Sequence, residues 1–280
     1  MLRSDGRRSD EMRPIVVAYE KLDRVDGSAR FAFGETETTA SVSGPLEARA
    51  SLESPSQATL DIHIRPLASV PGTDSRAFAT ILKTVLAPSL LLSHNPRTLI
   101  QLVGQALCGS DSGSGTGTVG HGWNISLMAS LINASTAAFV NSGSIPMRGV
   151  VCAVAIGRLP NGSSGEPGCT LVLDPSEIEL PKLEGGGCFA FLFSATTSKS
   201  LVQTEVPAAS LLWRNYSASN GSFDETEFAN AQSLARHGAE ELWHAMKRSL
   251  PGTIDPPLAQ HIFGRSASLV EGIDDENMEI

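Results

Sequence analysis

The spacing of apolar residues along this chain switches between two periods, and that switching limits the folds open to it. From Ala58 to Arg65 apolar and polar residues alternate, as they do in a half-buried strand. Behind Asp74, which we expect to cap a helix, the apolar residues recur at helical spacing: Phe78, Ile81, Leu82, Val85 and Leu86. The chain therefore combines strands with helices.

The same reasoning places the remaining elements. We expect further strands at 31–43 (interrupted at Gly34 and ended by Gly44-Pro45), 98–108, 150–156, 169–173 and 189–195. Further helices are expected at 126–141 and from a capping box, Ser222 with Glu225, to near Pro251. Three strands, a helix, a strand, a helix, three strands and a helix predict an α/β or α+β domain, with helices packed on a mixed sheet.

The domain organisation follows from composition. We expect residues 13–250 to form one domain, residues 1–12 a flexible N-terminus, the Gly/Ser-rich stretch 109–122 a loop, and residues 251–280 a disordered acidic tail. The formal net charge is −9, and residues 250–280 carry −5 of it. A globally basic nucleic-acid binder is excluded, whereas a local basic groove is not.

Several classes of site are disfavoured. No apolar run approaches the roughly 20 residues that span a bilayer, and the charged N-terminus does not resemble a signal peptide, so we expect no membrane partner. The four cysteines form no C-x-x-C pair, which argues against a zinc site and favours a reduced intracellular compartment. Gly115 to Gly120 matches G-x-G-x-x-G inside low-complexity sequence and is interpreted as loop. His237, Glu241 and His244 are interpreted as a solvated helix face, and no cofactor is expected.

Two groups of charged residues remain as candidates. Asp174, Glu177, Glu179 and Glu184 gather after an expected strand, where carboxylates bind Mg²⁺ or act as a general acid; a solvated loop is the alternative. Arg65, Arg76, Lys83 and Arg97 lie near expected strand and helix ends, where cations hold phosphate oxygens; dispersed surface charges are the alternative. The residues alone leave both questions open.

An ordered set of short motifs resembles the RNase PH family over about residues 13–250. The segments are Asp26-Gly27-Ser28-Ala29-Arg30-Phe31, Gly34-Glu35-Thr36, Val42-Ser43-Gly44-Pro45, Arg65-Pro66, His94-Asn95-Pro96-Arg97-Thr98, Ile145-Pro146-Met147-Arg148 and Leu171-Val172-Leu173-Asp174-Pro175. The resemblance implies the RNase PH fold, a ribosomal-S5-domain-2-like α/β sandwich. It also implies a ring of six such subunits in the eukaryotic RNA exosome, around an RNA channel beneath three RNA-binding cap proteins.

The resemblance also implies which residues matter. Active members bind phosphate through a helix start carrying Thr-Arg; here Ser126 keeps a hydroxyl, and Leu127 replaces the Arg. The family's aspartates are absent, although Glu177, Glu179 and Glu184 lie close by, and Gly185-Gly186-Gly187 looks inserted. We therefore expect a non-catalytic scaffold for 3′-to-5′ RNA processing and degradation, including that of rRNA, with Arg76, Lys83 and Arg97 contacting RNA. The implied location is nucleus, nucleolus and cytoplasm.

Two rival hypotheses stay open. One is a residual Mg-dependent or phosphorolytic exoribonuclease, acting as a homodimer and using Glu177, Glu179 or Glu184. The other is a binding module outside the exosome, whose acidic tail recruits basic partners.

Overall fold

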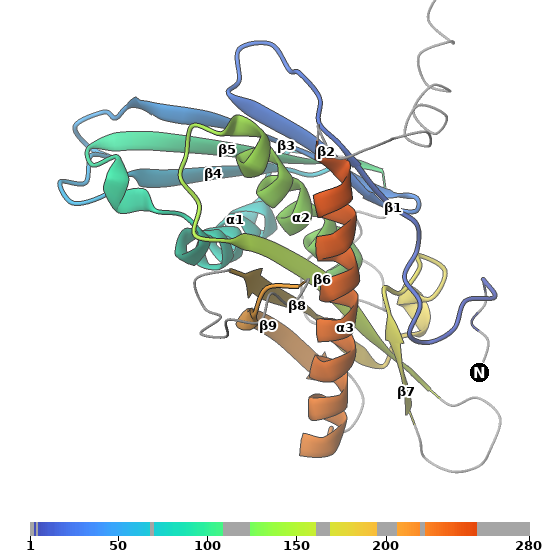
Figure 1. Ribbon diagram of the computed structural model, residues 1–280. Helices are drawn as coiled ribbons and strands as arrows, with labels where there is room; N and C mark the ends of the chain where they lie inside the picture. Colours follow the sequence, from blue (N-terminus) through green and yellow to red (C-terminus); the bar gives the residue numbers. More distant parts are fainter. Residues whose placement is uncertain are drawn as a thin grey trace, which may run out of the picture.

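The computed structural model describes residue 3 and residues 5–67, 70–108, 124–160, 169–194, 206–218 and 222–250. Two sheets enclose a central helix, and a second long helix covers the outside of the second sheet (Figure 1). The predicted stretches 109–122 and 251–280, together with the G-x-G-x-x-G match, lie outside the described residues.

The first sheet has five strands in the order β1-β2-β3-β5-β4. Their bounds are Ile15–Ala18 (β1), Gly27–Phe33 (β2), Thr36–Glu47 (β3), Thr59–Arg65 (β4) and Thr98–Cys108 (β5). All neighbours are antiparallel except β4 and β5, which are parallel, so the sheet is mixed as predicted. The predicted interruption at Gly34 is confirmed, because Phe33 pairs with Thr36 across a tight turn.

Two details of this sheet differ from expectation. The short strand β1 was not predicted, since four half-exposed residues carry too little periodicity to be recognised. Gly44-Pro45 does not end β3; the strand continues to Glu47 with a register shift between Ser43 and Leu46. A bulge is one of the few positions in a strand that tolerates proline, which has no N–H to donate to the ladder.

Helix α2 (Ile125–Ser142) lies between the two sheets, packing on β2 and β3 on one side and on β6 and β8 on the other (Figure 1). Its residues from Ile125 to Phe139 are all buried. By length and composition it is the one helix in the described ranges apolar enough to span a membrane. Most of it is buried inside the protein, and its position between two sheets accounts for its apolar composition.

The second sheet is antiparallel, with the strand order β7-β6-β8-β9. Its strands are Val150–Pro160 (β6), Cys169–Leu173 (β7), Gly185–Phe193 (β8) and Ala209–Ala218 (β9). Gly185 to Gly187, which looked like an insertion, form the start of β8 and pair with both β6 and β9. Strand β9 was not predicted, because its apolar residues Leu211, Leu212 and Trp213 are consecutive rather than alternating.

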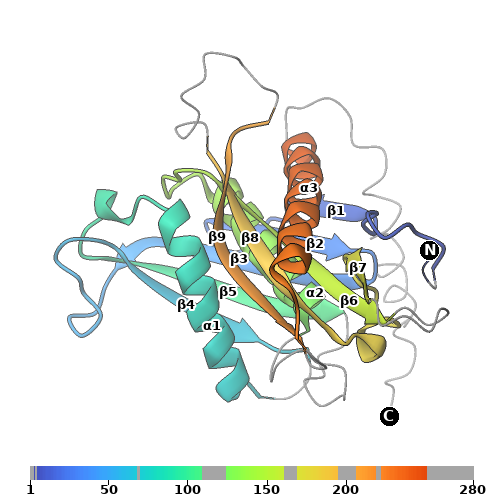
Figure 2. The same ribbon diagram turned by 90° about the horizontal axis from the view of Figure 1, so that it is seen from below.

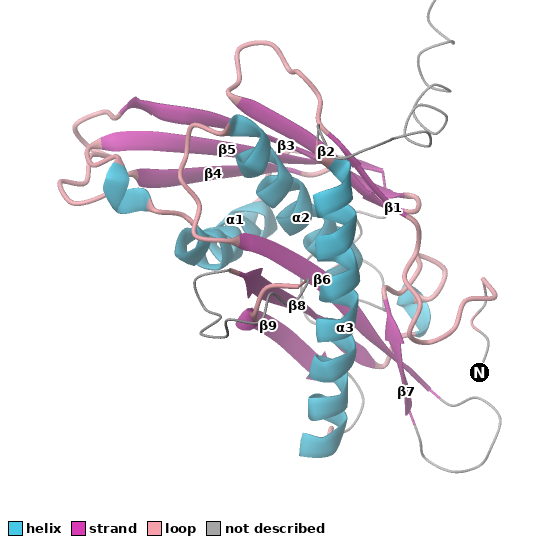
Figure 3. Cartoon of the chain, viewed as in Figure 1, coloured by secondary structure: helices cyan, strands magenta, loops and turns pink. Residues whose placement is uncertain are grey.

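Helices α1 and α3 form where the hydrophobic spacing predicts them, but their N-caps differ from those expected. Helix α1 (Thr73–Leu86) packs on β4, and its N-cap is Gly72 rather than Asp74. Helix α3 (Glu225–Ser249) covers β6 and β8 and reaches β1 (Figure 2). Its N-cap is Asp224, so the predicted capping box at Ser222 is wrong: the helix starts later, and no side chain caps it. Short 3-10 turns complete the described elements at Ala87–Ser89 (η1), Leu92–His94 (η2) and Leu180–Lys182 (η3) (Figure 3).

Candidate functional site

The start of α2 contains Ser126 and Leu127, which the resemblance predicts to match the family's phosphate-binding turn. Asn124 is the N-cap, and its side-chain oxygen accepts a hydrogen bond from the Ser126 N–H at 2.9 Å. The Ser126 hydroxyl, expected to be free for an anion, instead donates to the Pro175 carbonyl oxygen at 2.9 Å. Ser126 and Leu127 are each 1% exposed. The expected anion donor is therefore already used inside the protein, and Leu127, expected to replace a family arginine, is part of the core.

The acidic segment after β7 is neutralised from the N-terminus of the chain. Arg13 binds Asp174 in a two-pronged arrangement, with Nε to Oδ2 at 2.8 Å and Nη2 to Oδ1 at 2.6 Å. Arg3 does the same to Glu179, with Nε to Oε1 at 2.9 Å and Nη2 to Oε2 at 2.5 Å. Both carboxylates are nearly inaccessible, at 1% for Asp174 and 2% for Glu179. Planar guanidinium groups match carboxylates in this geometry, and charge strengthens each bond.

Further contacts join Arg3 and residues 5–12 to the end of β7, while the expectation of a flexible N-terminus stays a prediction. Arg3 also donates to the Leu173 and Asp174 carbonyl oxygens, and Arg7 lies 3.8 Å from the Asp174 carboxylate. The Leu173 N–H donates to the Ser9 carbonyl oxygen at 2.8 Å. These contacts join the described part of the segment to partners more than 160 residues away along the chain.

The pKa of Glu179 depends on its burial and on its hydrogen-bond partners. Burial by itself raises the pKa of a carboxyl group. At Glu179 the hydrogen bonds from Arg3 and from the Ser176 N–H, with the charge of Arg3, outweigh burial and hold the pKa below its usual value of 4.5. Glu179 is therefore a carboxylate engaged in an ion pair at neutral pH, and a general acid would need the opposite shift.

The other two candidate acids do not join Glu179 in a cluster. Glu177 is half-buried in the turn that precedes η3, and Glu184 accepts a weak hydrogen bond from the Cys169 thiol at 3.6 Å. Across the described part of the chain, no group of three or more His, Cys, Asp or Glu side chains has a geometry suited to a metal ion. The described side chains thus offer no ready ligand set for Mg²⁺.

The candidate cations divide into two places. Arg65 at the end of β4 and Arg76 in the first turn of α1 line one pocket of about 370 Å³, and Lys83 follows two turns along the same exposed helix face. None of the three forms an ion pair within the described residues; we call them the α1 basic surface. Arg97 precedes β5, at the far end of the parallel β4–β5 pair, and its Nε lies 3.4 Å from a Glu53 carboxylate oxygen.

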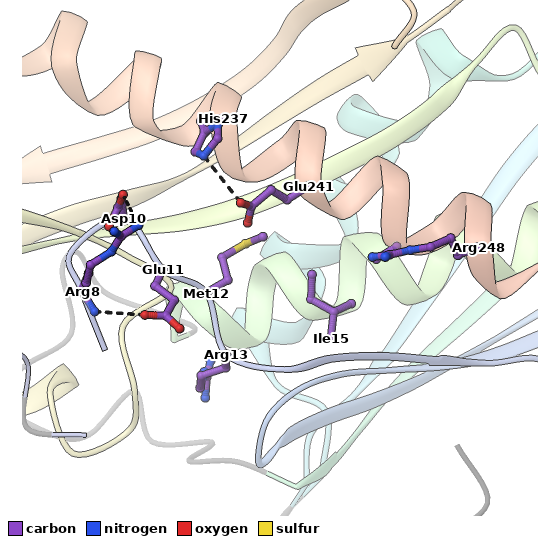
Figure 4. Close-up of a pocket in the computed structure, with 10 residues that line it drawn as sticks. Arg8, Asp10, Glu11, Met12, Arg13, Ile15, His237, Glu241 and Arg248 are labelled. Atoms are coloured by element: carbon purple, nitrogen blue, oxygen red, sulfur yellow. Dashed lines mark hydrogen bonds and ion pairs between the residues drawn. The ribbon is translucent and has the colours of Figure 1, made fainter. Parts of the chain in front are cut away.

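A second pocket, of about 270 Å³, lies between the N-terminal segment and α3 (Figure 4). Two ion pairs lie in its lining: His237 Nε2 lies 3.5 Å from Glu241, and Arg8 Nη2 lies 3.0 Å from Asp10. His237 and Glu241 are exposed, in agreement with the solvated face expected there. This mixed surface gives no distinct preference for anions or cations.

Sequence reasoning found the acids and missed the arginines that hold them. Arg3 and Arg13 stand in a stretch of mixed charge with no periodicity, and their partners are 176 and 161 residues away. The one local signal is the density of arginine before β1, which by itself does not identify partners.

The fold defined above is a two-sheet α/β sandwich with a buried helix start facing an acidic connection. Residues 11–144 match the model of the 3′ exoribonuclease family, domain 1 (RNase PH). The rice protein named "Exosome complex exonuclease RRP46 homolog" is 30% identical over 203 residues, covering 72% of this chain and 75% of the relative. The Saccharomyces cerevisiae "Exosome complex component RRP46" is 27% identical over 238 residues, covering 85% and 95%.

Solved structures agree on the fold. The crystal structure of rice Rrp46 superimposes with a TM-score of 0.68 at 23% identity, covering 89% of this chain and all of that one. The Archaeoglobus fulgidus exosome with RNA bound to the active site gives a TM-score of 0.61 at 18% identity, covering 87% and 92%. The chain belongs to the RNase PH family of 3′ exoribonucleases.

Proposed function

We propose that this chain is a non-catalytic ring subunit of an RNA exosome. In that role it helps to form the channel through which RNA is processed and degraded from its 3′ end, rRNA included. Two relatives carry exosome component or exonuclease names, and the fold is that of exosome core subunits. We expect other RNase PH-like subunits as neighbours in the ring, RNA-binding cap proteins above it, and a location in nucleus, nucleolus and cytoplasm.

The observation that carries the absence of catalysis is the closed site at the start of α2. The Ser126 hydroxyl is bound to Pro175, Leu127 is in the core, and Arg3 neutralises Glu179. Phosphorolysis needs preorganised donors aimed at the developing charge, and losing one such donor commonly costs roughly 100- to 1,000-fold in rate. Here the matching positions are engaged in internal contacts.

A nuclease assay on the purified chain tests this. We expect no phosphate-dependent shortening of a 3′-labelled single-stranded RNA, beside an active phosphorolytic exoribonuclease as positive control. We also expect the tagged chain to recover other RNase PH-like subunits and cap proteins by affinity purification, and a fluorescent fusion to localise to nucleus, nucleolus and cytoplasm. Digestion that tracks the chain through every purification step would overturn the proposal.

The rival enzymatic function has one observation in its favour, the name of the rice relative as an exonuclease. Glu177 and Glu184 are the acids it would use, since Glu179 is already held by Arg3. Any activity found should then disappear in Glu177→Gln and Glu184→Gln variants. Activity unchanged in both variants would exclude these acids as its source.

The α1 basic surface supports the RNA-contacting part of the proposal. Two arginines meet in one pocket beside a helix N-terminus, whose free N–H groups favour anions, and Lys83 extends the positive charge along α1. Arg97 is separated from them by the length of β4, roughly 20 Å, and is partly neutralised by Glu53. Arg65 and Arg76 should therefore dominate over Arg97.

Substitutions separate these contributions. We expect Arg76→Ala to weaken binding of a single-stranded RNA by roughly three- to ten-fold at low salt, and Arg97→Ala by less than two-fold. The matched control is Lys21→Ala, which removes an exposed cation beyond β1, at the opposite edge of the same sheet. Equal losses in all three variants would mean that net charge, not this surface, determines binding.

A further inference from the structure

We propose that the acidic stretch 271–279 of this chain binds the α1 basic surface and competes with RNA for it. The inference rests on the proposed function, because it regulates the surface assigned there to RNA. It joins that surface, two arginines without an ion pair in the described ranges beside the outer strand β4, to a concentration of carboxylates in the sequence after α3.

The pocket at the α1 basic surface is lined by a strand edge and by two arginines, which suit an extended acidic chain. Four consecutive residues of β4, Ile62 to Arg65, line one wall, and Pro71, Ser75 and Arg76 line the other. Strand β4 is the outer strand of its sheet and pairs only with β5, so among the described strands its second backbone edge has no partner. Such an edge accepts an added strand through main-chain hydrogen bonds.

The polar groups around this edge have few internal partners. Arg65 and Arg76 are exposed and form no ion pair within the described ranges. Ser75 is 5% exposed and lines the pocket, and its hydroxyl makes no hydrogen bond to any residue that the structure describes. The exposed His63 ring already lies 3.1 Å from Asp61. Two guanidinium groups and the hydroxyl of a largely buried serine thus line the pocket and can bind carboxylate oxygens.

The occupant is identified by its charge and its reach. Residues 271–279 contain five carboxylates, Glu271, Asp274, Asp275, Glu276 and Glu279, and no lysine or arginine. Helix α3 ends at Ser249, and the 22 residues from there to Glu271 span up to roughly 70 Å when extended. A domain of this size has a radius of gyration of about 18 Å. The acidic stretch can therefore reach the α1 basic surface from the end of α3.

Because the acidic stretch belongs to the same chain as the α1 basic surface, even a weak interaction between them can be populated. A segment covalently joined to its own target acts at a local concentration that reaches the order of millimolar. RNA phosphates and these carboxylates compete for the same guanidinium groups, so the segment should remove weakly held RNA and leave tightly held strands in place. Salt should weaken both interactions, because both pair exposed charges.

The first experiment measures RNA binding by fluorescence anisotropy with the full chain at low salt. One variant carries Glu271→Gln, Asp274→Asn, Asp275→Asn, Glu276→Gln and Glu279→Gln together. We expect it to bind single-stranded RNA roughly five-fold more tightly than the unaltered chain. In a background of Arg65→Ala and Arg76→Ala, the same five substitutions should change affinity by less than two-fold. No gain in the first background, or an equal gain in both, overturns the inference.

The second experiment needs no RNA and therefore separates this inference from the proposed function. A zero-length carbodiimide reagent joins carboxylates to lysine amines in direct contact. We expect residues 271–279 to couple to Lys83 more than to Lys21, although Lys21 lies close to Tyr19, whose hydroxyl contacts Ser249 at the end of α3. Coupling to Lys21 alone overturns the inference, even where Arg76→Ala weakens RNA binding. A mixture of isotope-labelled and unlabelled chains shows whether coupling occurs within one chain or between two chains. Coupling only between two chains also overturns the inference. Coupling to Lys83 without RNA binding would retain the contact and reject its competition with RNA.

Discussion

At the scale of single residues, the two arginine–carboxylate pairs are the contacts on which the candidate site depends. Each places two charges in a nearly water-free position, and such a pair is stabilising only when its remaining hydrogen-bonding groups are satisfied. Arg3 meets this requirement with carbonyl oxygens of Leu173 and Asp174, and Glu179 accepts in addition from the Ser176 N–H at 2.8 Å. Removing one member leaves the other charge buried and unpaired.

The Arg3–Glu179 pair makes a prediction about acid stability. Because the pKa of Glu179 is depressed in the folded chain, its contribution is complete above the unfolded value of 4.5 and is lost as the pH falls through the folded pKa. We expect Glu179→Gln to lower the free energy of unfolding at pH 7 by roughly 3 kcal/mol. The difference from the unaltered chain should shrink below pH 4.5, as measured by urea denaturation between pH 3 and 7.

The control for that experiment is Glu240→Gln, because Glu240 forms an exposed pair with Arg236 on the surface of α3. Exposed pairs contribute less than about 1 kcal/mol. A pH-independent loss at Glu179 would show that the ionised carboxylate is not what stabilises the fold.

At the scale of elements, a side chain of α2 supplies backbone hydrogen bonds to β6 at a position where no neighbouring strand does. Strand β7 pairs with β6 only from Ile156 to Pro160, so at Ala153 the β7 side of β6 has no strand beside it in the described sheet. The side chain of Asn133 takes that place: it donates to the Ala153 carbonyl oxygen and accepts from the Ala153 N–H, both at 2.8 Å. A buried asparagine in an apolar helix is thereby explained.

Substitution of Asn133 tests this role. Asn133→Ala should leave a buried N–H and a buried carbonyl without partners, at a cost of roughly 2–4 kcal/mol in the free energy of unfolding. Ser135→Ala is the matched control, since that hydroxyl is equally buried on the same helix and donates only to the Leu131 carbonyl oxygen within it. Similar losses in both variants would assign the effect to helix packing instead.

At the scale of the whole molecule, Arg13 connects the two sheets. Its Nη1 donates to the Thr36 hydroxyl of β3 at 2.9 Å, while its Nε and Nη2 hold Asp174 directly after β7. The N-terminal segment carrying it also runs past α3 (Figure 4). One side chain thus links the first sheet, the acidic connection and the start of the chain.

Asp174→Asn is the variant that tests this link. We expect a loss of roughly 3–5 kcal/mol in the free energy of unfolding, because Arg13 is left buried without its counter-charge. Faster cleavage before Ile15 by a protease of broad specificity should accompany it, since the segment loses its anchor. Glu53→Gln, which removes the exposed partner of Arg97, should change neither measurement. Unchanged cleavage in Asp174→Asn would mean that Arg3 and the backbone contacts suffice to hold the segment.

Local spacing determined much of the fold. Alternation in β4 and the apolar stripes of α1 and α3 predicted those elements to within a few residues, because both periods come from backbone geometry that each segment carries alone. The replacement of a family arginine by Leu127 stays a prediction from the resemblance. Strands β1 and β9 were missed, because their residues are half-exposed at sheet edges and owe their conformation to pairing with a neighbour.

Only the tertiary structure shows which partners the residues of the candidate site have. The sequence predicts that the Ser126 hydroxyl donates to an anion, whereas in the structure it donates to the carbonyl oxygen of Pro175, 49 residues away. The sequence predicts Glu179 as a metal ligand or an acid, whereas in the structure it pairs with Arg3, 176 residues away. Periodicity and motifs predict the local conformation of a segment and which of its faces is buried. Partners at such separations are set only when the two sheets close around α2, which brings distant charges within reach of one another.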